Sequence, residues 1–264
     1  MKTALITGAS AGIGRELALL FAQHGHDLIV VARSRARLEA LAKEVRAGFG
    51  RRVDILVADL AVAGAAASVH EQVAALGHPV EVLVNNAGIA VPRPFADAEA
   101  GDLSAMMQLN VVALAELIHL FLPAMIGRGS GRILNVASVA AFQPTPMLSA
   151  YGATKAFVLS LTEGLSQELS GTGVTITAHC PGFVDTDLVR NAGEALGTPD
   201  VVPSFLLLDA AAVARDGFDA CMKGEVVRVS GWTYELLVQL GRLYPRWLVR
   251  NVAGIVARQY LGGR

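Results

Sequence analysis

The sequence predicts an α/β protein built on a doubly wound, seven-stranded parallel sheet. Short runs of Val, Ile, Leu and Ala alternate along the chain with longer segments of helical period. Continuous apolar runs indicate strands buried on both faces, and their alternation with helices is typical of parallel sheets with right-handed crossovers. With 264 residues, 53% of them hydrophobic, the chain can bury one large core. We therefore expect residues 1–264 to form a single domain.

Seven apolar runs are the expected strands, at residues 3–7, 27–32, 53–58, 80–85, 132–137, 174–180 and 225–229. Helical periodicity predicts helices at about residues 13–24, 35–47, 63–76, 103–127, 151–170 and 209–222. Three irregular stretches, residues 91–95, 142–148 and 183–205, follow the fourth, fifth and sixth strands. Because ligands bind outside the carboxyl ends of the strands in such sheets, these stretches are the expected substrate loops.

Composition excludes several classes of partner. The 22 basic and 23 acidic residues nearly balance, so no global field attracts nucleic acid, and no nucleic-acid partner is expected. Cys180 and Cys221 are isolated, which argues against a disulfide framework and a structural zinc site. The N-terminus meets Gly8 too early for a secretory signal, and no uninterrupted apolar stretch approaches the roughly 18 residues that span a bilayer. We expect a cytoplasmic protein with buried, reduced thiols.

Metal and hydrolase chemistry lack their usual motifs. The six histidines form no H-E-x-x-H or Cys/His cluster, so no metal ligands are expected. The G-x-S-x-G elbow is missing, which argues against acyl transfer. His179 falls in the sixth predicted strand, where a hydrogen-bonded core histidine is expected rather than a catalyst.

A glycine-rich turn follows the first predicted strand and opens the first predicted helix. Its expected cofactor-binding residues are Gly8, Ser10, Gly12, Ile13 and Gly14. Glycines let the backbone come close to a pyrophosphate, whose charge is met by N–H groups at the helix N-terminus. Such a turn can also be purely structural, but its place between strand and helix favours a dinucleotide-binding site.

The end of the second strand bears on the choice of dinucleotide. A cofactor with a free ribose 2'-OH usually meets a carboxylate there, whereas this sequence has Arg33 and Ser34. A guanidinium beside a hydroxyl suits a 2'-phosphate through charge-assisted hydrogen bonds. NADP(H) is therefore expected in preference to NAD(H), although Arg33 could also be a solvated charge at the start of a helix.

The candidate catalytic residues are Ser138, Tyr151 and Lys155. Tyr151 and Lys155 are four residues apart in YGATK, so a helix brings both side chains to one face. Ser138 follows the fifth predicted strand, thirteen residues before Tyr151. Together with TGASAGIG, NNAG at residues 85–88, QLN around Asn110 and PGFVDT at residues 181–186, this pattern resembles the short-chain dehydrogenase/reductase (SDR) family. The resemblance runs from about residue 3 to 229 and implies a Rossmann-like fold.

The chemistry expected of these residues is hydride transfer to or from a carbonyl carbon. Tyr151 would protonate the developing alkoxide, and Ser138 would orient the substrate oxygen. A phenol has a pKa of about 10, which Lys155 and an oxidised nicotinamide ring are expected to lower by on the order of 1 to 3 units. The resemblance implies that Asn110 holds a water linking Lys155 to solvent, so that Lys155 tunes the phenol and relays protons.

The resemblance also implies further contacts with the cofactor. Asp59 and Leu60 are expected near the adenine ring, and Asn86, Ala87 and Gly88 around the adenosine and nicotinamide ribose. Pro181, Gly182 and Thr186 are expected at the nicotinamide end, with Thr186 against the carboxamide.

Residues 231–264 extend beyond the last predicted strand. Leucines and Trp247 recur there with helical period, and Arg242, Arg246 and Arg250 repeat every fourth residue. Because a proline inside a helix costs about 3 kcal/mol, Pro245 should divide the extension into two helices with a corner near Tyr244. Three roles stay open: a lid or subunit contact, plain packing on the sheet, and a membrane-surface helix, which is the least favoured of the three.

These observations predict an NADPH-dependent reductase of an apolar ketone or aldehyde. The three expected substrate loops contain Pro92, Pro94, Phe95, Phe142, Pro144, Met147, Leu148, Phe183 and the apolar residues 205–208. NAD-dependent oxidation of a secondary alcohol is an alternative, as is a non-catalytic NADP-binding regulator of the same fold. The resemblance further implies a homodimer or homotetramer that pairs the helices at residues 103–127 and 151–170.

Overall fold

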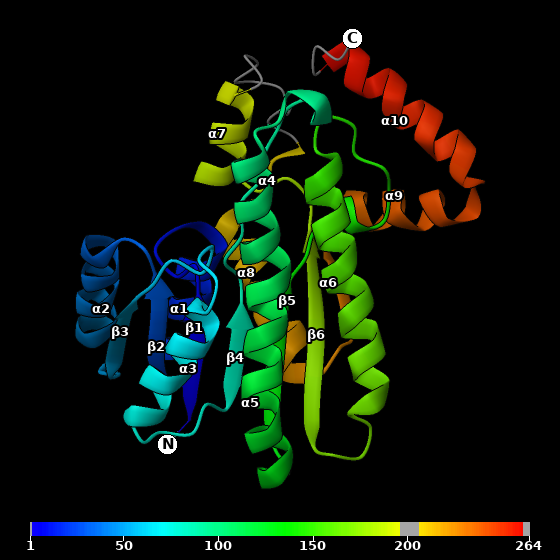
Figure 1. Ribbon diagram of the computed structural model, residues 1–264. Coiled ribbons are helices and arrows are strands. Elements are labelled where there is room, and N and C mark those ends of the chain that lie inside the picture. Colours follow the sequence, from blue (N-terminus) through cyan, green and yellow to red (C-terminus); the bar gives the residue numbers. More distant parts are fainter. Residues whose placement is uncertain (1, 196–205, 261–264) are drawn as a thin grey trace.

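The computed structural model describes residues 2–195 and 206–260. Its middle layer is a parallel sheet of strand order β3-β2-β1-β4-β5-β6-β7 (Figure 1). The strands are β1 (Thr3–Thr7), β2 (Asp27–Ala32), β3 (Val53–Val57), β4 (Val82–Asn85), β5 (Gly131–Val136), β6 (Val174–Pro181) and β7 (Val227–Ser230). The predicted fold class is confirmed, with strand boundaries that differ from the expected ones by at most two residues.

Helices cover both faces of this sheet. One face carries α1 (Gly12–Gln23), α2 (Arg35–Phe49) and α8 (Ala210–Lys223), and the other carries α3 (Ala65–Ala75), α5 (Leu114–Arg128) and α6 (Ser149–Glu168) (Figure 1). Along β1, Leu5 packs against the face covered by α3, α5 and α6, and Ile6 against the face covered by α1, α2 and α8. Successive side chains of a strand point to opposite faces of the sheet. Apolar residues that alternate along the central strands therefore build two cores, one on each side of the sheet.

The strand order places a crevice at the carboxyl ends of β1 and β4. The chain runs from β1 outward through β2 to β3, and then returns to add β4 on the other side of β1. Helices connected to β1 and β4 consequently lie on opposite faces, so the loops after these strands diverge. Ligands of open α/β sheets bind at such a switch point.

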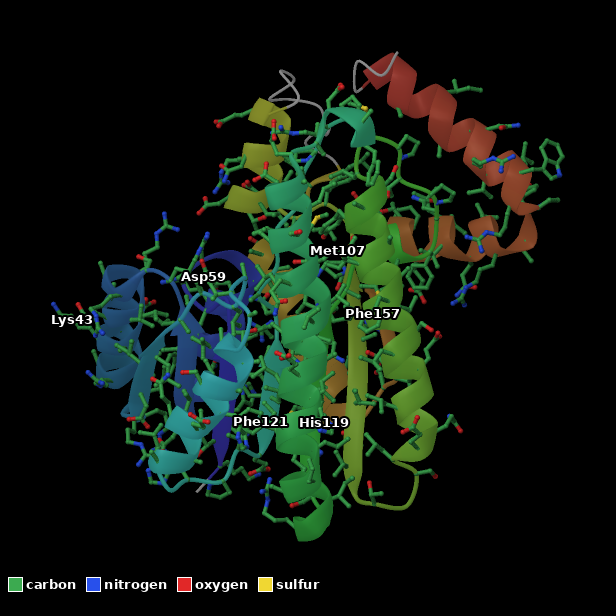
Figure 2. The ribbon with its side chains drawn as sticks, viewed as in Figure 1. Lys43, Asp59, Met107, His119, Phe121 and Phe157 are labelled. Atoms are coloured by element: carbon green, nitrogen blue, oxygen red, sulfur yellow. The ribbon has the colours of Figure 1, made fainter. Side chains whose placement is uncertain are left out.

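The predicted helix at residues 103–127 is a longer run of three segments, α4 (Ala100–Met107), the π-helical segment η2 (Gln108–Ala113) and α5. By length and composition this run is apolar enough to cross a membrane, although Asn110 and Glu116 interrupt its apolar sequence. Its Leu117, Phe121 and Met125 are buried against the sheet and neighbouring helices, which explains its hydropathy as that of a core helix. Figure 2 shows Phe121 on this helix.

The third expected loop is more ordered than predicted. Within residues 183–205, Val184 forms a parallel bridge with Leu208, and α7 spans Asp187–Ala195. The sequence prediction missed α7 because nine residues are too short a segment for helical periodicity to be recognised. Residues 196–205 and Phe205 among them lie outside the described residues.

The C-terminal extension forms two helices, α9 (Trp232–Leu243) and α10 (Arg246–Tyr260). The corner falls where it was predicted, since Tyr244 is extended at φ −99° and ψ 148°. A residue before proline avoids the helical region because the proline ring would clash with it. Figure 1 shows the pair at the carboxyl-end side of the sheet, with α10 leading away from the central layers.

Candidate active site

The glycine turn lies between β1 and α1 at the switch point. Gly8 and Gly12 have φ values of +67° and +53°, which side chains disfavour. Gly14 is needed for a different reason, because a Cβ atom there would lie 2.4 Å from the Gly8 carbonyl oxygen. The turn is thus compact, and it delivers the chain directly into the N-terminus of α1.

Thr7 and Asn86 hold this turn against the end of β4. The Thr7 hydroxyl accepts hydrogen bonds from the backbone N–H groups of Asn86 and Ala87 at 3.0 and 3.1 Å. In return, the Asn86 side-chain amide donates to the carbonyl oxygens of Thr7 and Gly8 at 3.0 and 3.2 Å. The loops after β1 and β4 are therefore fixed to each other by hydrogen bonds of the protein itself.

The resulting cradle fits a dinucleotide pyrophosphate. Ala11 is the N-cap of α1 and provides no side-chain cap, so the first N–H groups of the helix have no side-chain acceptor there. Ser10 and Ile13 flank these groups and are partly buried. Uncapped N–H groups and the positive end of the helix dipole form an anion site, and the glycines leave room for backbone contact.

The expected adenosine contacts border the same crevice. Arg33 follows β2 with its side chain exposed, and Ser34 caps α2 by accepting a hydrogen bond from the Arg37 N–H. Among the described residues, no carboxylate pairs with Arg33. Asp59 is exposed and accepts a hydrogen bond from the Ala61 N–H at 3.0 Å, while Leu60 is buried (Figure 2). An exposed arginine therefore stands after β2, at the position where a carboxylate would select a ribose hydroxyl.

Ser138 and Tyr151 meet beside the carboxyl end of β5. Ser138 is buried and begins the short 3-10 helix η3 (Val139–Ala141), where its hydroxyl accepts a hydrogen bond from the Ala140 N–H at 3.1 Å. Tyr151 lies in the first turn of α6, and the Ser138 side chain is near enough to its phenol to act on its pKa. Two hydroxyl groups from separate elements are thus brought to one point.

Lys155 lies one turn further along α6 and is buried. Its ammonium group is 5.7 Å from the centroid of the Tyr151 ring and donates a hydrogen bond of 2.8 Å to the Val136 carbonyl oxygen. Burial lowers the pKa of Lys155 to about 8, because the charged amine loses its hydration. This lysine is therefore poised to exchange a proton near neutral pH.

The pKa of Tyr151 departs from the sequence prediction. Burial raises it to about 12, although the neighbouring Ser138 side chain acts in the opposite direction. The prediction that Lys155 lowers this pKa is wrong for the protein alone, because the Lys155 ammonium donates to Val136 rather than to the phenol. The expected effect of an oxidised nicotinamide ring stays a prediction. Tyr151 is accordingly a protonated acid throughout the neutral range.

Asn110 lies in the π-helical segment and is buried. Its amide nitrogen donates to the Ile89 carbonyl at 2.9 Å and to the Thr154 hydroxyl at 3.1 Å, while its oxygen accepts from the Ile89 N–H at 3.0 Å. A Cβ at Gly88 would lie 3.3 Å from this oxygen and 3.4 Å from the Lys155 amine. Asn110 and Lys155 thus both lie beside Gly88, while the water that Asn110 is expected to hold stays a prediction.

The loop after β6 closes the other side of the crevice. A Cβ at Gly12 would meet the Thr186 methyl group at 3.0 Å, which places Thr186 beside the glycine turn. Pro181 is buried at the end of β6, and Gly182 lies so close to the Tyr234 ring that an added Cβ would clash with it. The three residues expected at the nicotinamide end therefore border the same crevice.

Two expected substrate loops bind each other near Tyr151. The Arg93 N–H donates to the Met147 carbonyl oxygen at 2.9 Å. Met147 has a φ of +68° and is the one non-glycine residue in the left-handed region among residues 2–195 and 206–260. Such a conformation costs roughly 1 to 3 kcal/mol and persists only where the surroundings impose it. The site-facing loop before α6 is therefore held in a strained shape.

Other titratable residues have structural environments. His179 bonds the Ser230 hydroxyl through its Nε2 atom at 2.7 Å, and burial lowers its pKa to about 4, as suits a core histidine. Cys180 and Cys221 are buried thiols whose pKa values burial raises to about 12. Within the described part of the chain, no group of three metal-ligating side chains occurs.

A surface hollow lies beside α4 and the π-helical segment η2. It has a volume of about 720 Å³ and is lined by Ala61, Ala63, Phe95, Gly101, Leu103, Ser104, Ala105, Met107, Gln108 and Val112. Figure 2 shows Met107, the last residue of α4, on the outer side of that helix. The hollow contains none of the expected catalytic residues, although Phe95 belongs to the first expected substrate loop.

Fold and site together define a protein of the Rossmann type with a candidate dinucleotide-dependent oxidoreductase site. A glycine turn at the switch point of the sheet, a Tyr–Lys pair on one helix and a serine on the adjacent strand end form its core. The chain belongs to the short chain dehydrogenase family, whose model matches residues 2–197.

Named relatives fall in the same family. The chain is 37% identical over 183 residues to ketoacyl reductase HetN of Nostoc, covering 69% of this chain but only 63% of that protein. It is 38% identical over 215 residues to sulfoacetaldehyde reductase 2 of Chromohalobacter salexigens, covering 80% of this chain and 84% of the relative.

Solved structures agree with the fold. A short-chain dehydrogenase from Sphingobium yanoikuyae in complex with NADPH superposes with a TM-score of 0.82 at 33% identity, covering 92% of this chain and 94% of that chain. A Burkholderia phymatum relative in complex with NAD gives a TM-score of 0.80 at 26% identity, covering 90% and 92%. Both kinds of nicotinamide dinucleotide thus occur among the structural relatives.

Three functional residues were absent from the predicted site. Thr7 locks the two cofactor loops, Thr154 binds Asn110, and the Val136 carbonyl receives the Lys155 ammonium. Thr7 could have been found as the last strand residue before the glycine turn. The other two depend on how α6 packs beside β5 and η2, which no local pattern of the sequence encodes.

Proposed function

We propose that this protein reduces an apolar ketone or aldehyde to the alcohol with NADPH, in a reversible reaction. The observation that carries the proposal is the meeting of the Ser138 hydroxyl, the Tyr151 phenol and the buried Lys155 amine at the carboxyl end of β5. These groups supply an orienting donor, an acid and a proton source for one carbonyl oxygen.

In this mechanism, Ser138 and Tyr151 both hydrogen-bond the substrate oxygen. When bound, the nicotinamide ring supplies the hydride for reduction and accepts it for oxidation. Negative charge then develops on the oxygen, and Tyr151 donates its proton as that charge appears. The pKa of about 12 keeps the phenol protonated in the reductive direction. Lys155, whose pKa is about 8, replaces the proton.

Asn110 positions the route by which Lys155 regains its proton. Its amide ties Ile89 to Thr154, and so fixes the π-helical segment beside the amine. π-helical segments inside α-helices occur frequently at functional sites. The role of Asn110 is therefore positioning rather than contact with the substrate.

The preference for NADPH rests on Arg33 and Ser34. An exposed guanidinium at the end of β2, with no acidic partner among the described residues, can pair with a 2'-phosphate. The NADPH-bound structural relative supports this choice, and the NAD-bound relative keeps the NAD-linked alcohol oxidation as the alternative. Reversing the charge at Arg33 separates the two.

An apolar substrate is favoured by the loops around Tyr151. Phe142, Met147 and Leu148 precede α6, and Phe183 lies 6.5 Å from Tyr234 between ring centroids. Apolar linings with a few convergent polar groups are typical of small-molecule sites. The HetN relative is a ketoacyl reductase, which suits a carbonyl on an aliphatic chain.

The test is NADPH oxidation against a panel of aliphatic, aromatic, steroidal and 3-oxoacyl carbonyls, with NADH in parallel. The wild-type chain should turn over at least one apolar carbonyl, and Tyr151→Phe should lose roughly 100-fold or more of kcat while keeping its NADPH affinity. Equal turnover by both proteins would instead favour the non-catalytic regulator.

We further propose that residues 1–264 form one domain, and that two or four copies associate through α5 and α6. Met107 and Phe157 support this association, since each is 39% exposed on the outer side of the helices that cover β4 to β6 (Figure 2). Sedimentation of the purified protein measures the number of copies.

A cytoplasmic location is proposed from the two buried thiols.

A further inference from the structure

The outer surfaces of α9 and α10 expose an unusual amount of apolar side chain. Trp232, Leu236, Leu240 and Leu243 form a stripe along α9, spaced by four, four and three residues, and their exposed fractions range from 40% to 78%. On the inner side, Tyr234 and Val238 are buried. The stripe therefore faces away from the protein body.

The second helix continues this surface beyond the corner. Trp247, Val252 and Ile255 of α10 are 59%, 51% and 55% exposed, and Tyr244 at the corner is 54% exposed. Both tryptophans of the chain, Trp232 and Trp247, belong to this surface. We name Trp232, Leu236, Leu240, Leu243, Tyr244, Trp247, Val252 and Ile255 the apolar arm surface.

Positive charge is concentrated in the C-terminal extension that carries this surface. Of the 22 basic and 23 acidic residues in the chain, five arginines and one glutamate fall in residues 231–264. The extension is therefore basic, whereas the rest of the chain is acidic. Arg246 and Arg250 are exposed on α10, next to the apolar arm surface. An anionic surface would attract this extension and repel the rest of the chain.

We propose that α9 and α10 bind the surface of an anionic lipid bilayer. Amphipathic helices with arginines on one face and Trp or Leu on the other lie in the headgroup region, where their apolar face is buried at the acyl boundary. Trp and Tyr prefer that depth because their rings are amphipathic. The exposure seen in the structure reverses the order expected from sequence, in which packing on the sheet ranked above lipid contact.

The inner side of α9 connects this surface to the active site. The Tyr234 hydroxyl donates to the Leu206 carbonyl at 2.7 Å, and its ring packs against Gly182. The Arg242 guanidinium lies 5.3 Å from the centroid of Phe142, in the loop that follows Ser138. A bilayer bound to the outer side would thus lie next to the substrate loops. An apolar substrate could then pass from lipid to enzyme without crossing water.

The two tryptophans make the test direct. The 264-residue chain is mixed with vesicles of phosphatidylcholine, with and without phosphatidylglycerol, and tryptophan emission is followed together with co-sedimentation. We expect a blue shift, quenching by lipids brominated on the acyl chains, and binding about tenfold or more tighter when phosphatidylglycerol is present. Added salt should weaken the binding, because it screens the arginines.

Matched variants locate the contact. Arg246→Glu combined with Arg250→Glu should weaken binding about tenfold or more, whereas Lys43→Glu combined with Arg215→Glu makes the same net charge change on exposed residues of α2 and α8 and should have little effect. Ile255→Glu should weaken binding, but Ile126→Glu, on a residue 42% exposed at the end of α5, should not. Retained NADPH binding and helical circular dichroism show that each variant is folded.

The opposite results overturn the proposal. Absence of wild-type binding to phosphatidylglycerol vesicles would do so, as would equal binding by the arm and control variants. A third outcome would assign the surface to a second copy of the chain: Ile255→Glu, but not Ile126→Glu, reduces the sedimenting mass, and vesicles leave the tryptophan emission unchanged. None of these outcomes bears on the reductase chemistry, which the carbonyl panel tests separately.

Discussion

The Lys155 ammonium donates a 2.8 Å hydrogen bond to the Val136 carbonyl, which ends β5 two residues before Ser138. This bond ties α6 to the strand that carries the serine, so the amine is held beside the Tyr151 ring instead of reaching solvent. Burial at this position lowers the pKa of the lysine to about 8. The place of the amine beside Tyr151 and its burial thus go together with this contact.

The first prediction concerns reduction rate and pH. In the reductive direction, the phenol stays protonated to about pH 12, whereas Lys155 loses its proton near pH 8. If Lys155 replaces the proton given by Tyr151, kcat for reduction should fall as the pH rises through about 8. A pH profile of kcat at saturating NADPH measures this, and a flat profile from pH 6 to 10 would exclude Lys155 as the proton source.

The second prediction concerns stability and pH at the same residue. The folded pKa of Lys155, about 8, lies below the unfolded value of 10.5, so the unfolded chain binds more protons between these pH values. The contribution of Lys155 to the free energy of unfolding should therefore rise with pH in this window, by about 1 kcal/mol between pH 7 and 9. Below pH 8 both states are protonated and the cost of burying the charge is present in full.

Lys155→Met isolates that contribution. The difference in the free energy of unfolding between wild type and variant should change with pH by the amount given above, measured by urea denaturation at pH 7, 8 and 9. Comparing the two proteins removes the titration of Cys180 and Cys221, which both share. A difference independent of pH would mean that Lys155 is not desolvated as the structure shows.

The third prediction concerns the glycine turn. Gly14→Ala should abolish dinucleotide binding, because the new Cβ would lie 2.4 Å from the Gly8 carbonyl oxygen and 2.3 Å from the Asn86 amide nitrogen. Gly48→Ala in α2 is the matched control, since nothing lies within 4 Å of its Cβ and alanine favours a helix by roughly 1 kcal/mol. NADPH titration by fluorescence measures both. Equal affinities would show that the turn does not bind the cofactor.

The fourth prediction concerns cofactor choice. Arg33→Asp should weaken NADPH binding by tenfold or more and leave NADH binding unchanged or tighter, because a carboxylate repels a 2'-phosphate and accepts from a 2'-OH. Arg35→Asp, two residues further on and also exposed, provides the control for net charge. The dissociation constants of both variants for NADPH and for NADH measure this preference. Parallel losses for NADPH and NADH would assign Arg33 no part in the choice.

The fifth prediction concerns Asn110. Asn110→Leu removes both partners of the Ile89 backbone and leaves its partly buried N–H and carbonyl groups without them. Each unsatisfied group costs about 1 to 3 kcal/mol, so the melting temperature should fall clearly. If Asn110 also positions the proton route, Asn110→Ser should reduce kcat more than it changes KM. Unchanged kinetics in a folded Asn110→Ser protein would limit this residue to a structural role.

Much of the architecture could be predicted from local pattern. The apolar runs of β1 and β2 coincide with the observed strands to the residue, because a parallel strand buried on both faces needs an uninterrupted apolar sequence. The corner between α9 and α10 follows from the ring of Pro245 and its effect on Tyr244. Local pattern failed for α7, which is short, and for the π-helical segment, whose extra residue per turn depends on its surroundings.

The sequence by itself determined the order of the motifs along the chain, the glycine turn and the one-turn spacing of Tyr151 and Lys155. Each of these is a property of residues that are close together in the sequence. Only the tertiary structure decided that Lys155 donates to Val136, that burial raises the pKa of Tyr151, and that the stripe on α9 faces outward. Hydration and hydrogen-bond partners are set by elements far apart in the chain. A periodic pattern shows which residues share a face, but only packing determines what that face meets.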